Sequence, residues 1–478
     1  MVASAPSLVW FRQDLRLADN PALIAAAAAG PVIPVYILDD ETRGLRGIGG
    51  ASKWWLHQSL RSLAADLAER GLSLVLRRGP AAAALSELVR DSSAHSVFWN
   101  RCYEPGTIAR DSAIKQQLTA EGIRAASFNA NLLLEPWEIT TGGGDPYRVF
   151  TPFWRALCAR LLLGEVPPMP PLSPGPKLRS DSLDDWNLLP TKPDWAGGLR
   201  NAWQPGEAGA LRQLDKFIDE GLGRYADERN RPDLPSSSSL SPHLHWGEIS
   251  PGQIWRAVRR AADAEPALER HAASYLREIG WREFSYHLLY HFSYLPDRPL
   301  RPEFERFDWT DDPALRMAWS RGKTGYPLVD AGMRQLWQTG WMHNRVRMVV
   351  ASFLIKHLLQ DWRHGEAWFW DTLVDADLAS NAASWQWVAG SGADAAPYFR
   401  IMNPILQGQK FDPNGDYVRQ FVPEIADLPT EYLHTPWTAP ADVLATAGIE
   451  LGRSYPYPLI DHVAGRNRAL AAFARLRE

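Results

Sequence analysis

The chain has 478 residues, which is too long for one ordinary core and predicts two domains with a connection. Its apolar content of 45% and charged fraction of 22% are typical of a globular protein that dissolves in water. The net charge of -4 and the pI near 6.3 exclude bulk attraction to DNA or anionic membranes, so any nucleic-acid binding requires a local basic face.

Short apolar runs alternate with helical patterns over residues 1–131. This alternation predicts a doubly wound α/β domain, in which helices cover a parallel sheet and ligands bind at the carboxyl ends of the strands. We expect strands at 8–11, 32–38, 72–76 and 96–100, and helices at 54–69 and 81–89.

Residues 132–204 differ in character, with three glycines at 142–144 and a proline-rich stretch at 166–176. We interpret this segment as an interdomain connection with one helix at 150–163. Residues 205–478 predict a mainly helical domain, with helices at 210–220, 251–262, 272–290, 328–337 and 345–359. No solenoid repeat or heptad run is found in the sequence.

The two cysteines, Cys102 and Cys158, are too few for a disulfide framework and lack metal-ligand spacing. They predict a reducing, cytoplasmic location and no metal site. Charged residues from Arg12 to Arg16 interrupt the place where a signal peptide needs its apolar core, and no apolar run of about 18 residues occurs. We therefore expect neither export nor membrane spanning.

Tryptophan is unusually dense between Trp337 and Trp387. Because the indole N–H needs a partner and the ring is large, such density is rarely used for packing alone. The pattern indicates an aromatic, redox-capable site.

Three polar clusters carry candidate chemistry. Glu278, Trp281 and Arg282 share one face of a predicted helix, which suits a flat heteroaromatic ligand, although a core tryptophan beside a surface ion pair gives the same pattern. The serine run at 236–241 offers hydroxyls and turn amides to a pyrophosphate, or is a flexible linker. The group of Asp375, Asp377 and Asn381 is either functional or an ordinary helix cap.

Long blocks of this sequence resemble the photolyase and cryptochrome family, and most closely its bacterial cyclobutane pyrimidine dimer (CPD) photolyases. The resemblance covers nearly the whole chain. The blocks are LVWFRQDLRLADNPAL at 8–23, GKTGYPLVDAGMRQL at 322–336, GWMHNRVRM at 340–348, DAAPYFRIMNP at 394–404 and YPYPLIDH at 455–462.

The resemblance implies an α/β antenna domain followed by a helical domain that binds FAD. Asn381 matches the residue that faces the flavin N5 atom, and an amide there can donate or accept a hydrogen bond. Plant and insect cryptochromes replace this asparagine, so its presence favours repair over signalling. The positions that match flavin contacts are Tyr225, Ser237, Ser238, Ser239, Leu240, Ser241, Tyr275, Arg282, Asp375, Ala376, Asp377 and Asn381.

The implied activity is light-driven repair of UV-damaged DNA, in which photoexcited reduced FAD gives an electron to a cyclobutane dimer and recovers it. Glu278 and Asn344 match residues that hydrogen-bond the flipped pyrimidine pair, and a dimer lowers the cost of flipping because it already weakens the local duplex. The apolar walls of that pocket match Trp281, Trp387 and Met348.

Trp385, Trp362 and Trp309 match the family's electron-transfer chain to the flavin, and core packing is a fair alternative for any one of them. A further set matches or neighbours positions expected on the DNA face, where basic side chains contact phosphates without reading sequence. These residues are Arg229, Arg345, Arg400, Gln407 and Lys410.

A second, antenna chromophore is also implied, and its identity stays open between folate, deazaflavin and flavin. Glu104 matches an acidic position of folate-binding members, whereas Leu295 and Pro296 replace a Cys-Lys pair that helps to hold folate. The segment 47–60 is the alternative lining for a deazaflavin or flavin.

The rival functions are a (6-4) photolyase, a DASH-type enzyme for single-stranded DNA and a cryptochrome-like blue-light sensor. Met348 stands where a (6-4) enzyme has the second of two active-site histidines, while His343 is present. We expect a monomer that binds damaged DNA, with no membrane and no obligatory protein partner.

Overall fold

The computed structural model describes residues 5–166, 168–398 and 400–476. They pack as two compact units, each assembled from separate stretches of the chain. Unit 1 runs to Asp219 and also contains Ser238–Ser293 and Val374–Asp377. Unit 2 contains Glu220–Ser237, Tyr294–Leu373 and the chain from Leu378 onward.

The amino-terminal part of unit 1 is a five-stranded sheet of order β3-β2-β1-β4-β5, and every neighbouring pair is parallel. In the central strand, Leu8 pairs with Ile33 of β2 and with Val97 of β4. The predicted α/β fold class is confirmed. The strands are β1 Ser7–Phe11, β2 Val32–Leu38, β3 Val75–Arg78, β4 Ser96–Asn100 and β5 Arg124–Phe128.

Two of the strands differ from the sequence prediction. β3 starts three residues later than expected, because its pairing with β2, from Val35↔Val75 to Leu38↔Arg78, extends over two arginines. β5 was not predicted, since this edge strand reads RAASF and has no apolar run.

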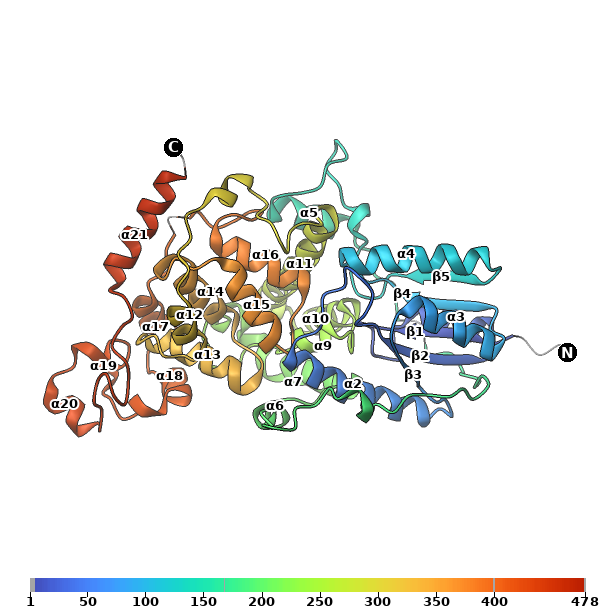
Figure 1. Cartoon of the computed structure of the whole chain (residues 1–478), viewed down its shortest axis with the longest axis horizontal. Helices are drawn as coiled ribbons and strands as arrows, with labels where there is room; N and C mark the ends of the chain where they lie inside the picture. Colours follow the sequence, from blue (N-terminus) through green and yellow to red (C-terminus); the bar gives the residue numbers. More distant parts are fainter. Residues whose placement is uncertain (1–4, 167, 399, 477–478) are drawn as a thin grey trace. The chain divides into compact units, whose positions relative to one another are not determined.

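Helices cover both faces of the sheet, as a doubly wound fold requires (Figure 1). Successive strand residues point to opposite faces, so Val9 packs in one core and Trp10 in the other. The Val9 face is covered by α1 Pro21–Ala29 and α2 Gly50–Ala68, and the Trp10 face by α3 Ala81–Ser92 and α4 Pro105–Ala120.

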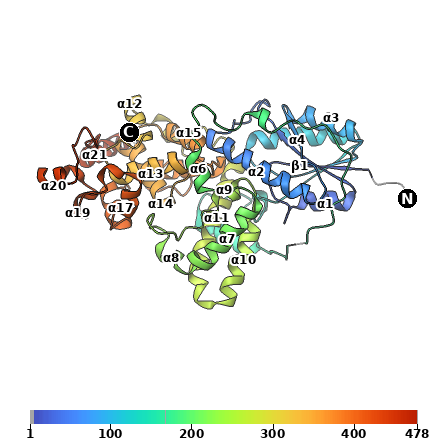
Figure 2. The same ribbon diagram turned by 90° about the horizontal axis from the view of Figure 1, so that it is seen from below.

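The remaining regular elements of unit 1 are helices, which are joined by long loops. Ser250 and Gln253 form a reciprocal cap at the start of α10, which fixes where that helix begins. The long helix α11 lies beside α10 (Figure 2). It also packs on α5. The helices are α5 Phe150–Arg160, α6 Gly197–Ala202, α7 Glu207–Lys216, α9 Ser241–His245, α10 Pro251–Ala264 and α11 Glu269–His291.

Unit 2 is built from helices and short turns. The turn before α13 closes on the buried carboxylate of Asp330, which accepts hydrogen bonds from Thr324, from the Gly325 amide and from the Tyr455 hydroxyl. Gly325 has φ +77°, and an added Cβ would lie 2.4 Å from the Tyr457 carbonyl oxygen, so only glycine fits.

The predicted helix over 345–359 is α14 Asn344–Ser352 continued by the π-helical turn Phe353–His357. The predicted helix over 328–337 is α13 Pro327–Thr339. The other helices of unit 2 are α8 Tyr225–Glu228, α12 Pro313–Ser320, α15 Trp362–Thr372, α16 Leu378–Ala389, α17 Pro404–Phe411, α18 Asp416–Phe421, α19 Thr430–Leu433, α20 Ala441–Thr446 and α21 His462–Arg475.

Within the described ranges, no helix combines the length and the apolar character that crossing a bilayer demands.

Candidate functional site

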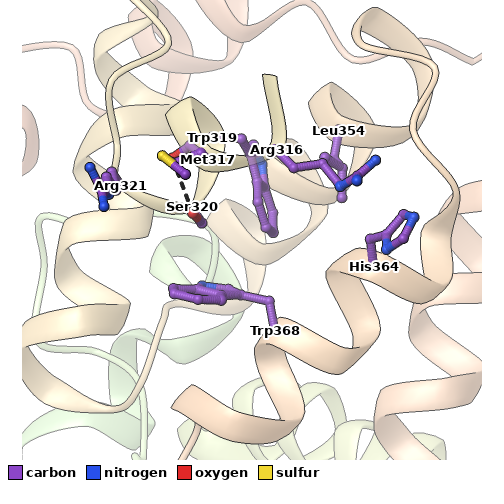
Figure 3. A pocket seen from close by; sticks show the side chains of 8 residues that line it. All are labelled: Arg316, Met317, Trp319, Ser320, Arg321, Leu354, His364 and Trp368. Carbon is purple, nitrogen blue, oxygen red and sulfur yellow. Dashed lines mark hydrogen bonds between the residues drawn. The ribbon is translucent and has the colours of Figure 1, made fainter. Parts of the chain in front are cut away.

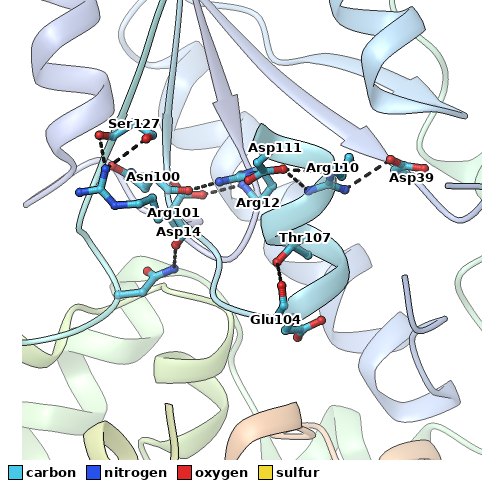
Figure 4. A network of polar contacts seen from close by, with 11 residues as sticks. Arg12, Asp14, Asp39, Asn100, Arg101, Glu104, Thr107, Arg110, Asp111 and Ser127 are labelled. Atoms are coloured by element: carbon cyan, nitrogen blue, oxygen red, sulfur yellow. Dashed lines mark hydrogen bonds and ion pairs between the residues drawn. The ribbon is translucent and has the colours of Figure 1, made fainter. Parts of the chain in front are cut away.

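The carboxyl ends of β1, β2 and β4 carry an ion-pair network (Figure 4). The Arg12 guanidinium donates to Asp111 at 2.5 Å, and Arg110 joins Asp111 to Asp39. Asn100 donates to the buried Asp14 carboxylate at 2.6 Å. The polar side chains that the sequence places at this edge therefore hold one another and fix the loops after the strands.

The segment 47–60, predicted as a possible chromophore lining, contributes mainly to the core of unit 1. Trp54 and Trp55 of α2 are 2% and 0% exposed, and the Trp55 N–H donates to Glu248 at 3.0 Å. Glu104 is the residue just before α4, where burial raises the pKa of its carboxyl and the nearby charge of Asp377 raises it further.

The serine run is ordered rather than a flexible linker. In unit 1, Ser238 is buried, accepts a hydrogen bond from the Tyr275 hydroxyl at 3.0 Å and offers its carbonyl to Gln213 at 2.8 Å. Ser239 adopts φ +51°, a conformation that side chains rarely take, and Leu240 is 1% exposed. The run therefore presents its hydroxyls and amides from a fixed turn that leads into α9.

The carboxylate of Asp377 is the centre of a second polar cluster in unit 1. It accepts the Tyr286 hydroxyl and lies 3.7 Å from the His245 ring nitrogen, and the Arg282 guanidinium lies 4.8 Å from the Tyr286 ring centroid. Burial alone would raise the pKa of Asp377, but His245, Arg282 and Tyr286 together hold it well below its usual range. A buried carboxylate that stays ionised is a strong acceptor for a polar ligand.

His245 and Tyr286 were not predicted as site residues. Tyr286 follows Arg282 by four positions on α11, so the shared helix face was a usable sign. His245 gave no such sign, because only the fold brings α9 to the Val374–Asp377 segment; that segment is anchored by a hydrogen bond from the Trp246 indole to the Val374 carbonyl at 3.2 Å.

Glu278 and Trp281 of α11 are both half-buried, as is Arg282. The predicted face of this helix therefore exists, and its three side chains reach the surface of unit 1. Arg282 also donates to the Asn131 carbonyl at 2.6 Å, which ties the helix to the loop after β5.

In unit 2, Asn381 is buried and its amide is oriented by one neighbour. Its NH₂ group donates to the Glu366 backbone carbonyl at 3.0 Å and to the Glu366 carboxylate at 2.8 Å. Both amide protons are thereby used, so the carbonyl oxygen of Asn381 is the atom left to meet a ligand. Glu366 was not predicted; it lies on α15, and only packing of α15 on α16 brings it to Asn381.

The predicted electron-transfer tryptophans all belong to unit 2. Trp385 and Trp362 are each 2% exposed, and Trp309 is half-buried. The Trp385 indole presses against α15 at Gly365, where an added Cβ would lie 2.0 Å from the ring. Trp362 is one helical turn before Gly365, and the segment after Trp309 pairs with the chain before Trp362 through the bridge Thr310↔Gln360.

A pocket of about 380 Å³ lies beside Trp319, whose ring contacts Trp385 (Figure 3). The Trp319 and Trp385 centroids are 6.3 Å apart, and Phe369 is 5.1 Å from Trp385. Neither Trp319 nor Phe369 was predicted. The pocket is lined by Arg316, Met317, Trp319, Ser320, Arg321, Leu354, His364 and Trp368.

The predicted lesion residues Asn344 and Met348 lie one turn apart on α14, so they share a face. Asn344 is exposed and Met348 half-buried, and Trp387 is half-buried on α16, which packs on α14. The α14 helix is capped by His343, whose Nδ1 accepts the Arg345 N–H at 3.2 Å.

The predicted DNA-contacting residues also belong to unit 2, and its structure draws several of the cations together. Burial lowers the pKa of Arg345, and the positive charges of Arg229 and Arg400 lower it further. Arg345 and Lys410 both lie over the Phe411 ring, at 4.6 and 5.2 Å from its centroid. Like charges gathered in this way favour an anionic partner.

The remaining predicted residues are placed as follows. Tyr225 is buried on α8 with the Arg229 guanidinium 5.6 Å from its ring centroid. Gln407 is half-buried on α17, and its Oε1 atom accepts no hydrogen bond from the described residues. Unit 1 holds Ser238, Ser239, Leu240, Ser241, Tyr275, Glu278, Trp281, Arg282, Asp375, Ala376 and Asp377, and unit 2 holds the other predicted site residues.

A parallel α/β sheet, a mainly helical remainder, and the buried Trp385 and Asn381 together on α16 are the features of a photolyase-type flavoprotein. Two family models match: "DNA photolyase" over residues 7–174 and "FAD binding domain of DNA photolyase" over residues 275–475. The chain belongs to the DNA photolyase and cryptochrome family.

Similar proteins include both repair enzymes and photoreceptors. The chain is 54% identical to a deoxyribodipyrimidine photo-lyase of Agrobacterium fabrum, over 99% of each chain. It is 42% identical to cryptochrome-1 of Arabidopsis thaliana, over 95% of this chain and 68% of that protein. The crystal structure of a class III photolyase from Agrobacterium tumefaciens matches with a TM-score of 0.96 and 53% identity, over 100% of this chain and 98% of that one.

Proposed function

We propose that this protein is a deoxyribodipyrimidine photo-lyase, a light-driven enzyme that splits cyclobutane pyrimidine dimers in DNA. When bound and reduced, FAD supplies the photoexcited electron that opens the two carbon–carbon bonds of the dimer, and the electron then returns to it. The observation that carries the proposal is the buried Asn381, held by Glu366 so that its carbonyl oxygen is presented to a ligand. An amide at this position is the repair-type residue of the family.

The side chains fit FAD in chemistry as well as by resemblance. The ordered serines, Ser237 to Ser241 with Leu240 among them, would hold the pyrophosphate through hydroxyls and amides, and Arg282 would add a positive charge. The ionised Asp377 and its neighbours Asp375 and Ala376 would accept hydrogen bonds from the ring system and ribitol chain. Tyr225 and Tyr275 would pack beside the cofactor.

The lesion would be held by polar and apolar groups together. Glu278 and Asn344 would hydrogen-bond the flipped pyrimidines, and the partial exposure of both permits contact with a substrate. Trp281, Trp387 and Met348 would exclude water, which strengthens those hydrogen bonds as negative charge develops on the dimer. Flipping costs least at a damaged step, so the lesion contributes to its own recognition.

The cations of unit 2 would position the DNA backbone. Arg229 and Arg400 each repel Arg345, and bound phosphates would relieve that repulsion. Lys410 and Gln407 extend the same surface in this proposal. Electrons from a reductant dissolved in the solvent, such as an added thiol, would reach oxidised flavin through Trp309, Trp362 and Trp385.

The proposal also covers the domain boundaries, the cellular location, the oligomeric state and the second chromophore. We assign the segments 1–131, 132–204 and 205–478 to an antenna domain, a connection and a catalytic domain. We further propose a cytoplasmic monomer without an obligatory protein partner, and a second, light-harvesting chromophore that is a folate, a deazaflavin or a flavin. Chromatography of the chromophores released from purified protein identifies it.

The decisive experiment illuminates the reduced protein with an oligonucleotide that contains one thymine dimer. Repair restores the thymine absorbance in proportion to light dose, and an undamaged oligonucleotide shows no change. The identity with cryptochrome-1 makes a blue-light sensor the second candidate. Unchanged absorbance with the reduced protein, while a separate sample of the oxidised protein still photoreduces its flavin, would favour that candidate and reject the repair proposal.

A further inference from the structure

The indole of Trp281 is clamped inside unit 1 by an aromatic residue outside the proposed site. The Phe150 ring lies parallel to Trp281, with centroids 3.8 Å apart and planes 6° apart. Phe284 meets Trp281 edge-on at 5.9 Å. One face and one edge of the indole are thus occupied by protein, so a pyrimidine can stack only on the opposite face.

Phe150 is itself held firmly. It is 1% exposed, Phe284 meets it edge-on at 5.9 Å, and Trp154 lies nearly parallel to it at 6.2 Å. The Arg277 guanidinium, one turn before Trp281 on α11, lies 4.8 Å from the Phe150 ring centroid and adds a cation–π contact. The ring therefore has no room to follow a moving indole.

The distance between α5 and α11 is fixed at Gly280, next to the stacked rings of Phe150 and Trp281. At Gly280, next to Trp281, an added Cβ would lie 2.3 Å from the Trp154 ring, so the two helices approach as closely as only glycine permits. This close approach delivers Phe150 at stacking distance. A half-buried tryptophan would otherwise exchange between rotamers.

From these contacts we infer that Phe150 is a positioning residue for repair, which fixes the plane in which Trp281 stacks on the flipped dimer. The inference rests on the proposed role of Trp281 as a lesion wall. Its consequence is that the wall is organised before DNA binds, so no rotamer freedom of Trp281 is lost on binding.

The variant Phe150→Leu keeps an apolar side chain but removes the flat aromatic ring. The variant Phe150→Tyr keeps that ring. Phe153→Leu is the matched control: Phe153 is on the same helix, 0% exposed, and contacts Phe284 and His287. Each variant is prepared as the full chain with reduced FAD. Dissociation constants are measured for dimer-containing and undamaged oligonucleotides, together with the melting temperature and the repair yield at saturating substrate.

We expect Phe150→Leu to raise the dissociation constant for dimer-containing DNA about three- to tenfold, because this is the change in affinity that the energy of one aromatic pair produces. Binding of undamaged DNA should stay unchanged. Phe150→Tyr should restore lesion affinity, and Phe153→Leu should lose comparable thermal stability without losing lesion affinity. If Phe150→Leu does not fold, Phe150→Met replaces it under the same criteria.

The inference is overturned if Phe150→Leu leaves lesion affinity within twofold of the wild type, or if Phe153→Leu weakens it equally. The variant Trp281→Ala distinguishes the proposed role of Phe150 from the proposed role of Trp281 as a lesion wall. Loss of lesion affinity in Trp281→Ala alone rejects the role of Phe150 and keeps the lesion wall, whereas unchanged affinity in Trp281→Ala rejects the lesion wall and the inference with it.

Discussion

His343, which caps α14, allows a quantitative prediction of how the stability of the protein depends on pH. His343 is 5% exposed, and its Nδ1 accepts the Arg345 N–H at 3.2 Å, which requires the neutral ring. Burial lowers the pKa of His343 from 6.5 to about 4, and the nearby charges of Arg345, Arg347 and Arg229 act in the same direction. The folded protein thus resists a proton that the unfolded chain accepts.

The sign of the pH effect follows from that difference. Above pH 6.5 both states hold a neutral ring, and the full stability is present. As the pH falls from 6.5 towards 4, only the unfolded chain gains the proton, so the free energy of unfolding decreases. A pKa fall from 6.5 to about 4 corresponds to about 3 kcal/mol, because each pH unit is worth about 1.4 kcal/mol.

His343→Asn is the informative substitution, because asparagine also caps a helix well but does not titrate. At pH 7 we expect the variant to lie within about 1 kcal/mol of the wild type. Between pH 6 and 4.5 its stability should fall less steeply, by up to about 1.4 kcal/mol per pH unit. Urea unfolding of the FAD-saturated protein across this range measures both slopes.

The same substitution at an exposed histidine, His95→Asn, is the control and should leave the slope unchanged. His287, whose pKa burial lowers to about 4, titrates in both proteins and cancels in the comparison. Parallel stability curves for the wild type and His343→Asn would refute the reasoning, since they would mean that His343 takes up its proton equally in both states.

Three further outcomes are expected. Trp385→Phe should slow photoreduction of oxidised FAD more than tenfold, while repair by pre-reduced enzyme stays within twofold; transient absorption and the repair assay measure these, and equal losses would contradict a relay role. Arg345→Ala should weaken binding of damaged and undamaged DNA alike and reduce the slope of log affinity against log salt by about one, so an unchanged slope would remove it from the phosphate-contacting set. Lys356 is 1% exposed and burial lowers its pKa to about 7, so wild-type stability should rise between pH 7 and 10.5 and Lys356→Met should flatten that rise, which alkaline urea titration checks; an unaltered rise would contradict it.

The local pattern of residues was enough for the fold class and for most helices. Strand period, proline at helix starts and the mainly helical second half are local properties, and the helices over 251–262 and 328–337 were located within two residues. The edge strand β5 was missed because its small and polar residues adopt a strand conformation only through pairing with β4.

The family and its candidate residues were also readable from the chain, because long motifs keep side-chain types at fixed spacing. Tertiary structure alone decided the partners of those residues. Glu366 orients Asn381, His245 helps to hold the pKa of Asp377 low, and Phe150 clamps Trp281, and each partner comes from a different element.

The physical reason is the range of the interactions. Helix and strand preferences act over a few residues, so the sequence displays them directly. Hydrogen bonds and ring stacking require atoms within a few ångströms, and packing brings together residues as distant as Phe150 and Trp281 only after the chain folds. The sequence by itself therefore determined which groups this protein has for its chemistry, and the tertiary structure decided how each one is held.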